Sequence, residues 1–561
     1  MKGMRRMFKS KTGLLILTFI LMLVSFIKPV YADQTTHPVL LVYDSQNVAD
    51  GDEKNIDSLQ RLLVSLNLPV KTLSMEQYQK GDLNDQDYQA LILMVNWPEA
   101  HLIKQSFVND MQNFHGKILH IGPSLTNFEK NRLQGDIRYL RHQQYFLYNQ
   151  QYKYYQMLNF VNSAQFVVKS ASNSQIFGEL VTQGNANGNV PYGVIHNNIA
   201  FLPYFKTNGL SFLEASDLIA NFFGEGHNIY YPLLVIKGIT PYTNLEQLTK
   251  VADYLHDEGI PFAVSATSVA VNTDLKAFKY YALALQYVEN DGGNVFLHVP
   301  AVYAADTSAN AFKTLRNDMT QTLTALCNNY VYPIGISAPS YWNQDGVYQS
   351  AALNLANQVL LTANDVTRPP YIKQDNYGIT YARAYYEMSL DSLNTIKGGS
   401  QYIRAGLHFS LPTAVTTTLP MTAKAFSQFK RNLHTILFRW LNLNNDDFKS
   451  NLKVGNKTVS FQLGNYFVNN EMVDVPLATA KISNEYKKQV TRGTLSGFFN
   501  INGIILEIFI FIAMAILILL FIIGYRVYLG KFKRSVYKED KKMLFDFDLG
   551  RLKSKNKKGG K

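Results

Sequence analysis

The sequence predicts an α/β protein with two successive α/β units, followed by one membrane-spanning helix. Three observations predict this. Short apolar segments alternate with amphipathic ones from residue 37, the alternation resumes after residue 229, and residues 504–523 form an apolar run with one charge. Short apolar runs between turn signals are typical of buried strands, and an apolar period near 3.6 residues is typical of helices. We therefore expect two layered α/β units and a transmembrane helix.

The first unit, residues 33–138, has the strand and helix rhythm of a flavodoxin-like parallel layer. Its expected strands are residues 39–43, 70–73, 91–95 and 118–121, and apolar residues at helical spacing separate the first two. The loop after the first strand has neither GxGxxG nor P-loop spacing, so nucleotide binding is not predicted. Asp44 and Asp50 stand at the carboxyl end of that strand, and we interpret them as part of a solvated loop.

Residues 139–228 have a different composition and form a predicted β extension. Tyrosines are concentrated near its start, and β-forming residues then alternate with Gly and Asn turns, as in antiparallel hairpins. Exposed aromatic rings in a secreted protein can stack on sugars, but packing in the core and across strands is the simpler interpretation.

The second unit, residues 229–445, repeats strands and helices of similar size. Asn244 is placed to cap a helix and Gly259 to end it. The expected elements are strands at residues 233–236, 260–267, 294–299 and 331–339 and helices beginning after residue 244 and spanning residues 276–290 and 309–329. The segment QYIRAGLHFSLP, residues 401–412, follows after a long connection. Such repetition suggests a (β/α) barrel or partial barrel, whose site lies in the loops at the carboxyl ends of the strands.

The two ends of the chain predict the topology. Residues 1–32 combine basic residues, an apolar stretch and small residues before Ala32, which indicates a secretory signal peptide; an uncleaved anchor is the alternative. Residues 446–503 form a juxtamembrane region, residues 504–525 the transmembrane helix, and residues 526–561 a tail with 13 Lys/Arg against 4 Asp/Glu. Basic residues favour the cytoplasmic side, so we expect a single-pass type I protein of the cell membrane with an extracellular ectodomain.

The net charge of +12 comes from the two ends. Residues 1–32 hold 6 Lys/Arg and no acid, which leaves residues 33–525 with 35 of the 54 basic and 38 of the 42 acidic side chains. The ectodomain is close to neutral, which argues against nucleic-acid binding, and the tail is suited to anionic lipid. Cys327 is the only cysteine, so neither an intrachain disulfide nor a thiolate zinc site is expected.

Five stretches of the second unit carry a resemblance to a known family. In order they read VIKGITP, LHDEGIPFAV, GGNVFLHVPAVY, YPIGISAPSYW and GLHFSLP. Their order and spacing resemble the polysaccharide deacetylases of the NodB-homology superfamily, and most of all an uncharacterised secreted branch associated with exopolysaccharide synthesis. The resemblance covers about residues 229–445 and implies a deacetylase-like (β/α) barrel.

The same resemblance implies a degenerate metal site. In the family, a pair of aspartates ends the first strand, one as general base and one as metal ligand, and here these positions match Lys237 and Gly238. Two histidines four residues apart complete the family's metal site; the first matches His298 and the second Val302. A hydrolytic zinc needs three protein ligands, so no metal cofactor is expected, and zinc only if the site is rearranged.

Two further elements match the family. The loop that lines its sugar groove matches Pro339, Tyr341 and Trp342, which we expect to form a stacking wall. His408 matches the general acid, a role that it holds only if the protein is active. Lys237 could occupy the space of the lost cation, bind an anionic sugar, form a structural ion pair, or have no role.

We therefore expect a membrane-anchored, catalytically inactive deacetylase-like protein. It would bind or guide a cell-surface polysaccharide, through Lys237, His298 and the aromatic loop, or contact proteins of polysaccharide synthesis or export. The alternative is an active deacetylase of an N-acetylhexosamine polymer with a rearranged metal site that recruits Asp306 or Asp345 with His298. Metal-free glycoside hydrolysis would need two carboxylates at a set separation, which a sequence does not reveal.

Overall fold

The computed structural model consists of two compact units, one up to Ala480 and one from Lys481. It describes residues 37–84, 87–149, 154–159, 161–182, 189–300, 309–364, 377–378, 381–398, 407, 409–436, 439–444, 448–478 and 506–531. The predicted signal peptide, residues 1–32, and most of the basic tail lie outside these residues.

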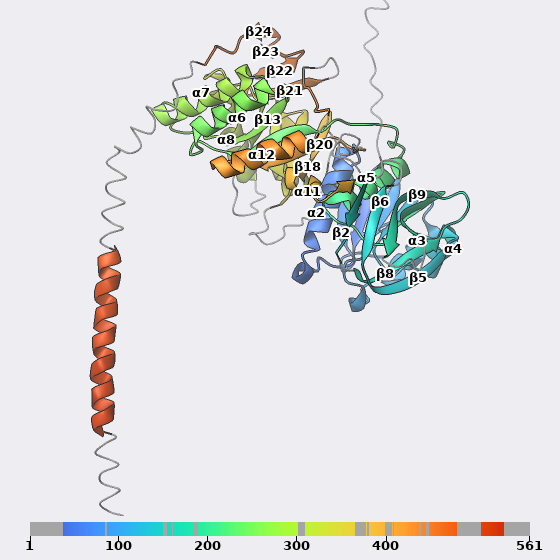
Figure 1. The fold of residues 1–561 in the computed structure, drawn as a ribbon. Coiled ribbons are helices and arrows are strands. Elements are labelled where there is room, and N and C mark those ends of the chain that lie inside the picture. The colour runs from blue at the N-terminus through green and yellow to red at the C-terminus, as the bar shows by residue number, and fades with distance from the viewer. Residues whose placement is uncertain are drawn as a thin grey trace, which may run out of the picture. The chain divides into compact units, whose positions relative to one another are not determined.

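The N-terminal part of the first unit is built on one large mixed sheet (Figure 1). Its strand order, within the described residues, is β17-β2-β1-β3-β4-β11-β10-β9-β6-β7-β19. Strands β2, β1, β3, β4 and β11 are parallel, and the strands beyond β11 are antiparallel. The parallel strands are β1 (Val39–Tyr43), β2 (Val70–Ser74), β3 (Ala90–Met94), β4 (Lys117–Ile121) and β11 (Ile199–Leu202).

Helices cover both faces of the parallel strands, because these strands are apolar on both sides. All five residues of β1 and of β3 are buried. Alternate residues of these strands, such as Leu40, Val42 and Leu91, form one core with α3 and α4. The helices of this region are α2 (Glu53–Ser65), α3 (Gln105–Asn113), α4 (Asn127–Leu133) and α5 (Gly209–Phe223), with short 3₁₀ helices η1 (Val48–Asp50) and η2 (Pro98–Ala100).

The four strands predicted for residues 33–138 are confirmed. The description of this part as flavodoxin-like remains a prediction. Strands β6, β7, β9 and β10 of the predicted β extension continue the large sheet beyond β11, which pairs with β4, whereas β5 and β8 pair with each other in a separate two-stranded sheet. Tyr145 and Tyr154 are buried there, and Tyr148 stacks on Tyr155 across two strands, as the core interpretation of these tyrosines predicted. The strands are β5 (Asp136–Gln143), β6 (Tyr145–Asn149), β7 (Tyr154–Met157), β8 (Val161–Lys169), β9 (Gln175–Thr182) and β10 (Val190–His196).

The second half of the unit is a closed parallel barrel in the order β12-β13-β14-β15-β16-β18-β20. Strand β20 pairs with β12 and completes the ring. The strands are β12 (Leu233–Ile239), β13 (Phe262–Thr267), β14 (Gly293–His298), β15 (Gly335–Pro339), β16 (Gln358–Thr362), β18 (Arg383–Ser389) and β20 (Thr413–Thr418). The expected barrel is therefore confirmed as a closed one, and its first four strands are the ones that the sequence predicts.

Helices follow several of these strands, and their ends match the sequence signals. The side chain of Asn244 accepts a hydrogen bond from the backbone N–H of Gln247 at 3.2 Å, and Gly259 has a φ of 65° just after that helix. The helices are α6 (Leu245–Asp257), α7 (Lys276–Asn290), α8 (Ala309–Cys327), α9 (Tyr341–Gln344), α10 (Gly346–Ala351), α11 (Leu390–Leu393) and α12 (Ala423–Thr435), with η3 (Leu353–Leu355).

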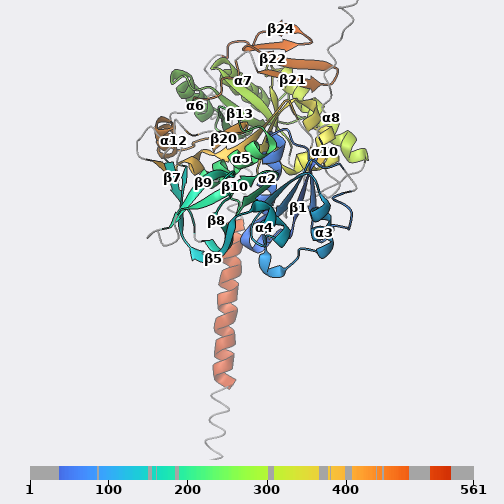
Figure 2. The ribbon, with the colours of Figure 1, turned by 90° about the vertical axis from the view of Figure 1, so that its right-hand side faces the viewer.

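Helix α2 joins the large sheet to the barrel. Ten of its residues are buried, because one side faces the sheet and the other faces β18. In Figure 2, α2 lies between the large sheet and the barrel. The Ser58 and Tyr386 hydroxyls lie 2.6 Å apart, and Gln60 donates to Thr72 on the sheet side at 2.7 Å. The strand β18 is therefore positioned by the N-terminal half of the chain.

The predicted juxtamembrane region, residues 446–503, begins with a small antiparallel sheet. It packs at the amino-terminal end of the barrel, where Gln358 donates to the carbonyl of Lys449 at 2.8 Å and Asn294 to the hydroxyl of Tyr466 at 3.3 Å. The strands of this small sheet are β21 (Lys449–Val454), β22 (Lys457–Gln462), β23 (Asn465–Val468) and β24 (Glu471–Val473).

Two short strands from the barrel half of the chain, β17 (Tyr377–Gly378) and β19 (Lys397–Gly398), form the two edges of the large sheet.

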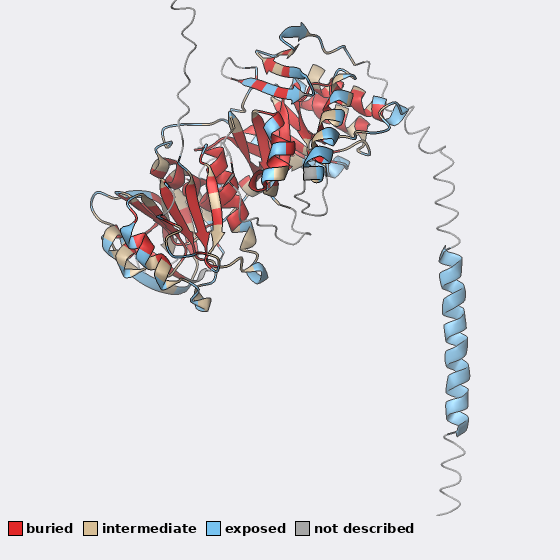
Figure 3. Cartoon of the chain, turned by 180° about the vertical axis from the view of Figure 1, so that it is seen from behind, coloured by how far each residue is buried: buried red, intermediate tan, exposed pale blue. Residues whose placement is uncertain are grey.

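The compact unit that begins at Lys481 contains one helix, Leu506–Lys531, among the described residues. Its 26 residues are long and apolar enough to cross a membrane, and its side chains are exposed in this structure (Figure 3). The helix continues six residues beyond the predicted end at residue 525, so it includes the first basic residues of the tail.

A buried charged pair supports the carboxyl end of β4. His120 and Glu129 are both fully buried, and the Nδ1 atom of His120 lies 2.7 Å from Glu129 Oε1 while its Nε2 atom lies 2.9 Å from the carbonyl of Pro123. Both partners are acceptors, so both ring nitrogens carry hydrogen. Burial lowers the pKa of His120, but the Glu129 carboxylate and its hydrogen bond outweigh burial and raise the pKa.

We expect this pair to make stability depend on pH. A histidine pKa that is raised by folding adds stability below the unfolded value of about 6.5, and that stability is lost as the pH rises through the folded pKa. The unfolding free energy of the full chain, measured with denaturant between pH 6 and pH 9, should therefore fall, and His120→Gln should reduce this slope. His196→Gln, a change at a second buried histidine, is the control; an unchanged slope in His120→Gln would refute the assignment.

Candidate functional site

The carboxyl end of the barrel gathers charged and polar side chains from several strands. Lys237 lies near the end of β12, His298 ends β14, Glu387 lies on β18, and Thr416 lies on β20. Since β20 and β12 are neighbours and β18 pairs with β20, the lysine, threonine and glutamate approach one another across the ring.

The ion pair between Lys237 and Glu387 is the central feature of this site. The Lys237 ammonium donates to Glu387 Oε1, which also accepts from the Thr416 hydroxyl at 3.0 Å, and Oε2 accepts from the backbone N–H of Ala363 at 2.7 Å. Glu387 is buried, whereas Lys237 is 40% exposed. Burial raises the pKa of Glu387, but Lys237 and then Arg61 outweigh it, so the pKa lies below its usual value and the carboxylate is ionised.

His298 belongs to a separate hydrogen-bonded chain within the barrel. Its Nδ1 atom lies 3.1 Å from the Ser337 hydroxyl, which lies 2.7 Å from the Ser265 hydroxyl. Burial is the main cause that lowers the pKa of His298 to about 4; Glu387 opposes the shift, and Lys237 adds to it. The imidazole is therefore neutral at neutral pH.

Helix α2 supports the ion pair from outside the barrel. Arg61 donates to the backbone carbonyl of Glu387 at 3.3 Å, and its guanidinium lies 4.3 Å from the ring centre of Tyr386. The Arg61 Nε atom also donates to Asp57 at 3.1 Å, and both side chains are buried. Because Arg61 fixes the backbone at residues 386–387, the N-terminal half of the chain sets the position of the Glu387 carboxylate.

The structure brings together only part of the predicted site. Lys237 and His298 share the electrostatic environment of Glu387, and of the roles considered for Lys237 the structure shows the ion pair. Gly238 has a φ of 78° next to an irregularity between β12 and β13, a conformation that side chains with a Cβ rarely adopt. The backbone here is therefore poorly suited to the aspartate of the family.

The predicted aromatic wall needs a correction. Pro339 and Tyr341 are half-buried, but Trp342 is fully buried and packs against Tyr348, with ring centres 5.0 Å apart. The indole of Trp342 is therefore core, not a surface on which a sugar can stack. The resemblance that placed it in a groove-lining loop did not reveal α9, in which this side chain is buried.

Asp345 is also structural. It is fully buried and caps α10, where its carboxylate accepts from the backbone N–H groups of Val347 at 2.8 Å and Tyr348 at 3.2 Å. These contacts do not support the suggestion that Asp345 joins His298 in a rearranged metal site. Val302, Asp306 and His408 lie outside the described residues.

Sequence reasoning missed Glu387 and Tyr242. Glu387 lies in the segment RAYYEMS, where a single carboxylate among aromatic and apolar residues was a signal for a buried partner of Lys237. Tyr242 lies in the loop after β12 and is 93% exposed. A tyrosine in a Thr-Pro-Tyr-Thr turn at the carboxyl end of a barrel strand was the available signal.

Within the described residues, no group of three or more His, Cys, Asp or Glu side chains is placed to hold a metal ion. The arrangement at the barrel end offers a half-exposed ammonium, an adjacent ionised carboxylate whose oxygens already accept hydrogen bonds, and a neutral imidazole. Such groups can bind polar ligands, but Glu387 is not free to act as a base or a metal ligand.

Comparisons with known proteins add little to this geometry. No family model matches the sequence, and no curated protein matches it. Among solved structures, the chain is similar to the Bc1960 peptidoglycan N-acetylglucosamine deacetylase in complex with 4-naphthalen-1-yl-N-oxidanyl-benzamide, with 12% identity and a TM-score of 0.21. The match covers 38% of this chain and 87% of that chain. A similarity at this level is only a weak structural likeness.

Proposed function

We propose that this chain is a membrane-anchored, extracytoplasmic protein with a deacetylase-like barrel that has lost catalysis and binds a cell-surface polysaccharide. The single observation that carries the proposal is the ion pair between Lys237 and Glu387 at the carboxyl end of the barrel. It stands where the resemblance to the deacetylases expects the pair of carboxylates that binds metal and activates water.

The ion pair is incompatible with metal-assisted hydrolysis at that position for two reasons. An ammonium repels a divalent cation, and Glu387 already accepts hydrogen bonds from Lys237, Thr416 and the backbone of Ala363. A hydrolytic metal needs about three protein ligands and an open position for water. His298 alone, held near Ser337, does not provide them.

Ligand binding is supported by what remains exposed around the same end of the barrel. Tyr242 projects from the loop after β12, five residues beyond the half-exposed Lys237. An exposed aromatic ring beside hydrogen-bonding groups suits the apolar face and the hydroxyls of a sugar. The helix Leu506–Lys531 is suited to tether this barrel to a membrane, and proteins of polysaccharide synthesis or export are the proposed partners.

The alternative is an active deacetylase with a rearranged metal site. It would need ligands beside His298, and Asp345 is engaged as a helix cap. The alternative therefore rests on residues outside the described part of the chain, such as Asp306 and His408, and no contact in the structure favours it.

We expect Tyr242→Ala to weaken binding of an N-acetylglucosamine hexamer by about 1 kcal/mol, roughly fivefold, because one stacked ring is lost. Binding would be measured by calorimetry on the full chain in detergent. Tyr330→Ala is the matched control, since Tyr330 is 51% exposed but lies before β15, at the opposite end of the barrel.

Two results would count against this proposal. Equal effects of Tyr242→Ala and Tyr330→Ala would remove the barrel end as the binding surface. One zinc ion retained per chain after dialysis, together with deacetylation of the hexamer that is lost in His408→Ala, would establish the alternative enzyme.

A further inference from the structure

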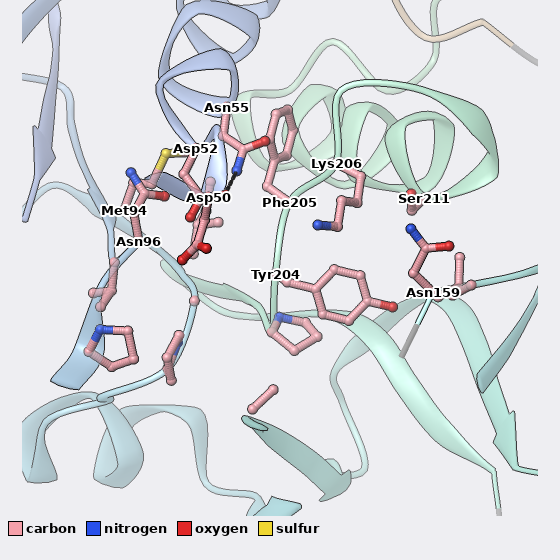
Figure 4. Close-up of a pocket in the computed structure, with 18 of the residues that line it drawn as sticks. Asp50, Asp52, Asn55, Met94, Asn96, Asn159, Tyr204, Phe205, Lys206 and Ser211 are labelled. Carbon is pink, nitrogen blue, oxygen red and sulfur yellow. Dashed lines mark hydrogen bonds between the residues drawn. The ribbon is translucent and has the colours of Figure 1, made fainter. Parts of the chain in front are cut away.

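A cavity of about 410 Å³ opens at the carboxyl edge of the parallel strands of the large sheet (Figure 4). It is lined by segments that follow β1, β3, β4 and β11, together with residues 156–159 and 208–211. Strand β1 lies between β2 and β3, so the chain runs from β1 to β2 on one side and then crosses to β3 on the other, and the strand order reverses next to this cavity. Ligands of open α/β sheets bind at such a reversal, and the volume suits a small ligand.

The charged side chains that line the cavity are mainly acidic. They are Asp50, Asp52 and Glu99 against one lysine, Lys206. Figure 4 shows the carboxylates of Asp50 and Asp52 on one side, with the ammonium of Lys206 pointing into the space between them and Tyr204. Burial raises the pKa of Asp52 above its usual value, and the hydrogen bond from Asn47 and the charge of Lys206 only partly oppose this shift. The lining therefore favours a ligand with positive charge.

A network of hydrogen bonds within the protein holds the acidic side of the cavity in place before any ligand binds. The side chain of Asn47, which has a φ of 41°, donates to Asp50 at 2.9 Å and to Asp52 at 2.8 Å, and Asn55 donates to Asp52 at 2.9 Å. Asp44, buried at the end of β1, accepts from the backbone N–H groups of Asn96 at 2.7 Å and Trp97 at 2.9 Å. Asp44 is therefore structural and not, as the sequence suggested, part of a solvated loop: it joins the loops after β1 and β3.

The other side of the cavity presents an aromatic ring and an unsatisfied hydroxyl. Tyr204 lines the cavity, and its hydroxyl points toward Asn159 in Figure 4. That hydroxyl is buried and has no hydrogen-bond partner among the described residues. A buried polar group without a partner costs about 1–3 kcal/mol, so a ligand that supplies the missing hydrogen bond would be favoured.

The carboxylates of the cavity are not arranged as a metal site. In the part of the chain that the structure describes, no three His, Cys, Asp or Glu side chains are grouped closely enough to hold a metal ion. An organic cation is therefore the better match to the charge, and the amides, hydroxyls and aromatic ring suit a ligand that also carries hydroxyls and a flat apolar face.

We propose that this cavity binds amino-sugar units that carry a free, protonated amine, with the ammonium at Asp50 and Asp52 and the sugar ring on Tyr204. The site is separate from the end of the barrel, and the inference does not depend on the function proposed there. It predicts recognition of a deacetylated amino-sugar polymer rather than its acetylated form, because acetylation removes the charge.

The probe is a β-linked glucosamine tetramer, titrated by calorimetry into the full chain in detergent at low salt. We expect binding that is at least tenfold tighter than binding of the N-acetylglucosamine tetramer and that weakens as salt is added. Asp50→Asn should weaken it about tenfold or more, because the carboxylate charge that pairs with the ammonium is lost, and Tyr204→Phe about three- to tenfold, because a hydrogen bond is lost. Asp318→Asn, the same charge change on an exposed residue of α8, should leave binding unchanged.

Three results would overturn the proposal: no binding of the glucosamine tetramer, equal binding of the two tetramers, or equal effects of Asp50→Asn and Asp318→Asn. Tyr242→Ala separates this site from the barrel end. If the cavity is correct and the barrel proposal is wrong, Tyr242→Ala changes binding of neither oligosaccharide while Asp50→Asn still weakens binding of the glucosamine tetramer.

Discussion

Replacing Trp342 with alanine is expected to lower the free energy of unfolding by about 3–5 kcal/mol, the usual cost of removing a large buried aromatic side chain. Trp342 is fully buried, and its ring packs against those of Tyr341 and Tyr348 at centre distances of 6.2 and 5.0 Å. The loss comes from the cavity left behind, not from a lost ligand contact. Denaturant unfolding of the full chain measures it.

Two further variants test this interpretation of Trp342. Tyr242→Ala, at a side chain that is 93% exposed, should change the unfolding free energy by no more than about 0.5 kcal/mol. Trp342→Phe should cost less than Trp342→Ala, because the Nε1 atom of Trp342 has no hydrogen-bond partner among the described residues. Wild-type stability in Trp342→Ala combined with weaker glycan binding would show instead that this ring reaches a groove.

Replacing Arg61 with methionine is expected to lower the free energy of unfolding by about 3–5 kcal/mol, because it leaves a buried carboxylate without its partner. The side chains of Arg61 and Asp57 are 3% and 9% exposed, and Arg61 also holds the backbone of Glu387. Burial raises the pKa of Asp57, and Arg61 is the main group that opposes this shift. Without Arg61, the Asp57 carboxyl should therefore take up a proton on folding.

A double-mutant cycle separates the charge from the packing. Asp57→Asn combined with Arg61→Met should cost less than the sum of the two single changes, because no buried charge is left unpaired. The control is Arg138→Met, since Arg138 and Asp136 form an exposed pair, 63% and 45% exposed, worth about 1 kcal/mol at most. Additive single changes at Asp57 and Arg61 would show that the two side chains act independently.

The fold was predictable wherever one strand or helix carried its own signal. The strands β1 and β12 are short and wholly or mostly apolar, and α6 has an Asn cap at its start and a Gly with positive φ after its end. These signals depend on neighbours in sequence, so they can be read without the fold. The later barrel strands β16 and β18 were not predicted, and β20 begins just after the expected segment at residues 401–412, although the amphipathic helix α12 follows it.

The site was predictable in position but not in contacts. A resemblance to the deacetylases placed Lys237 and His298 at strand ends, and the barrel does hold them at one end. It could not reveal Glu387, because the partner of Lys237 lies 150 residues away and is brought near only when β18 and β12 both pair with β20. It also placed Trp342 on the surface, because burial of a loop residue depends on the elements packed over it.

The sequence by itself determined the alternation of strands and helices, the apolar segment suited to a membrane, the near-neutral charge of residues 33–525 and the presence of a lysine and a glycine at residues 237–238. These properties follow from composition and from local spacing, which the chain carries in any conformation. Only the tertiary structure decided that the barrel closes and that Lys237 is paired with Glu387. It also decided that Arg61, from the other half of the chain, supports this pair. Finally, it decided that the loops after β1, β3, β4 and β11 enclose a cavity. The physical reason is that ion pairs, burial and cavities depend on distances between residues far apart in sequence, and those distances are set only when the strands pair and the core packs.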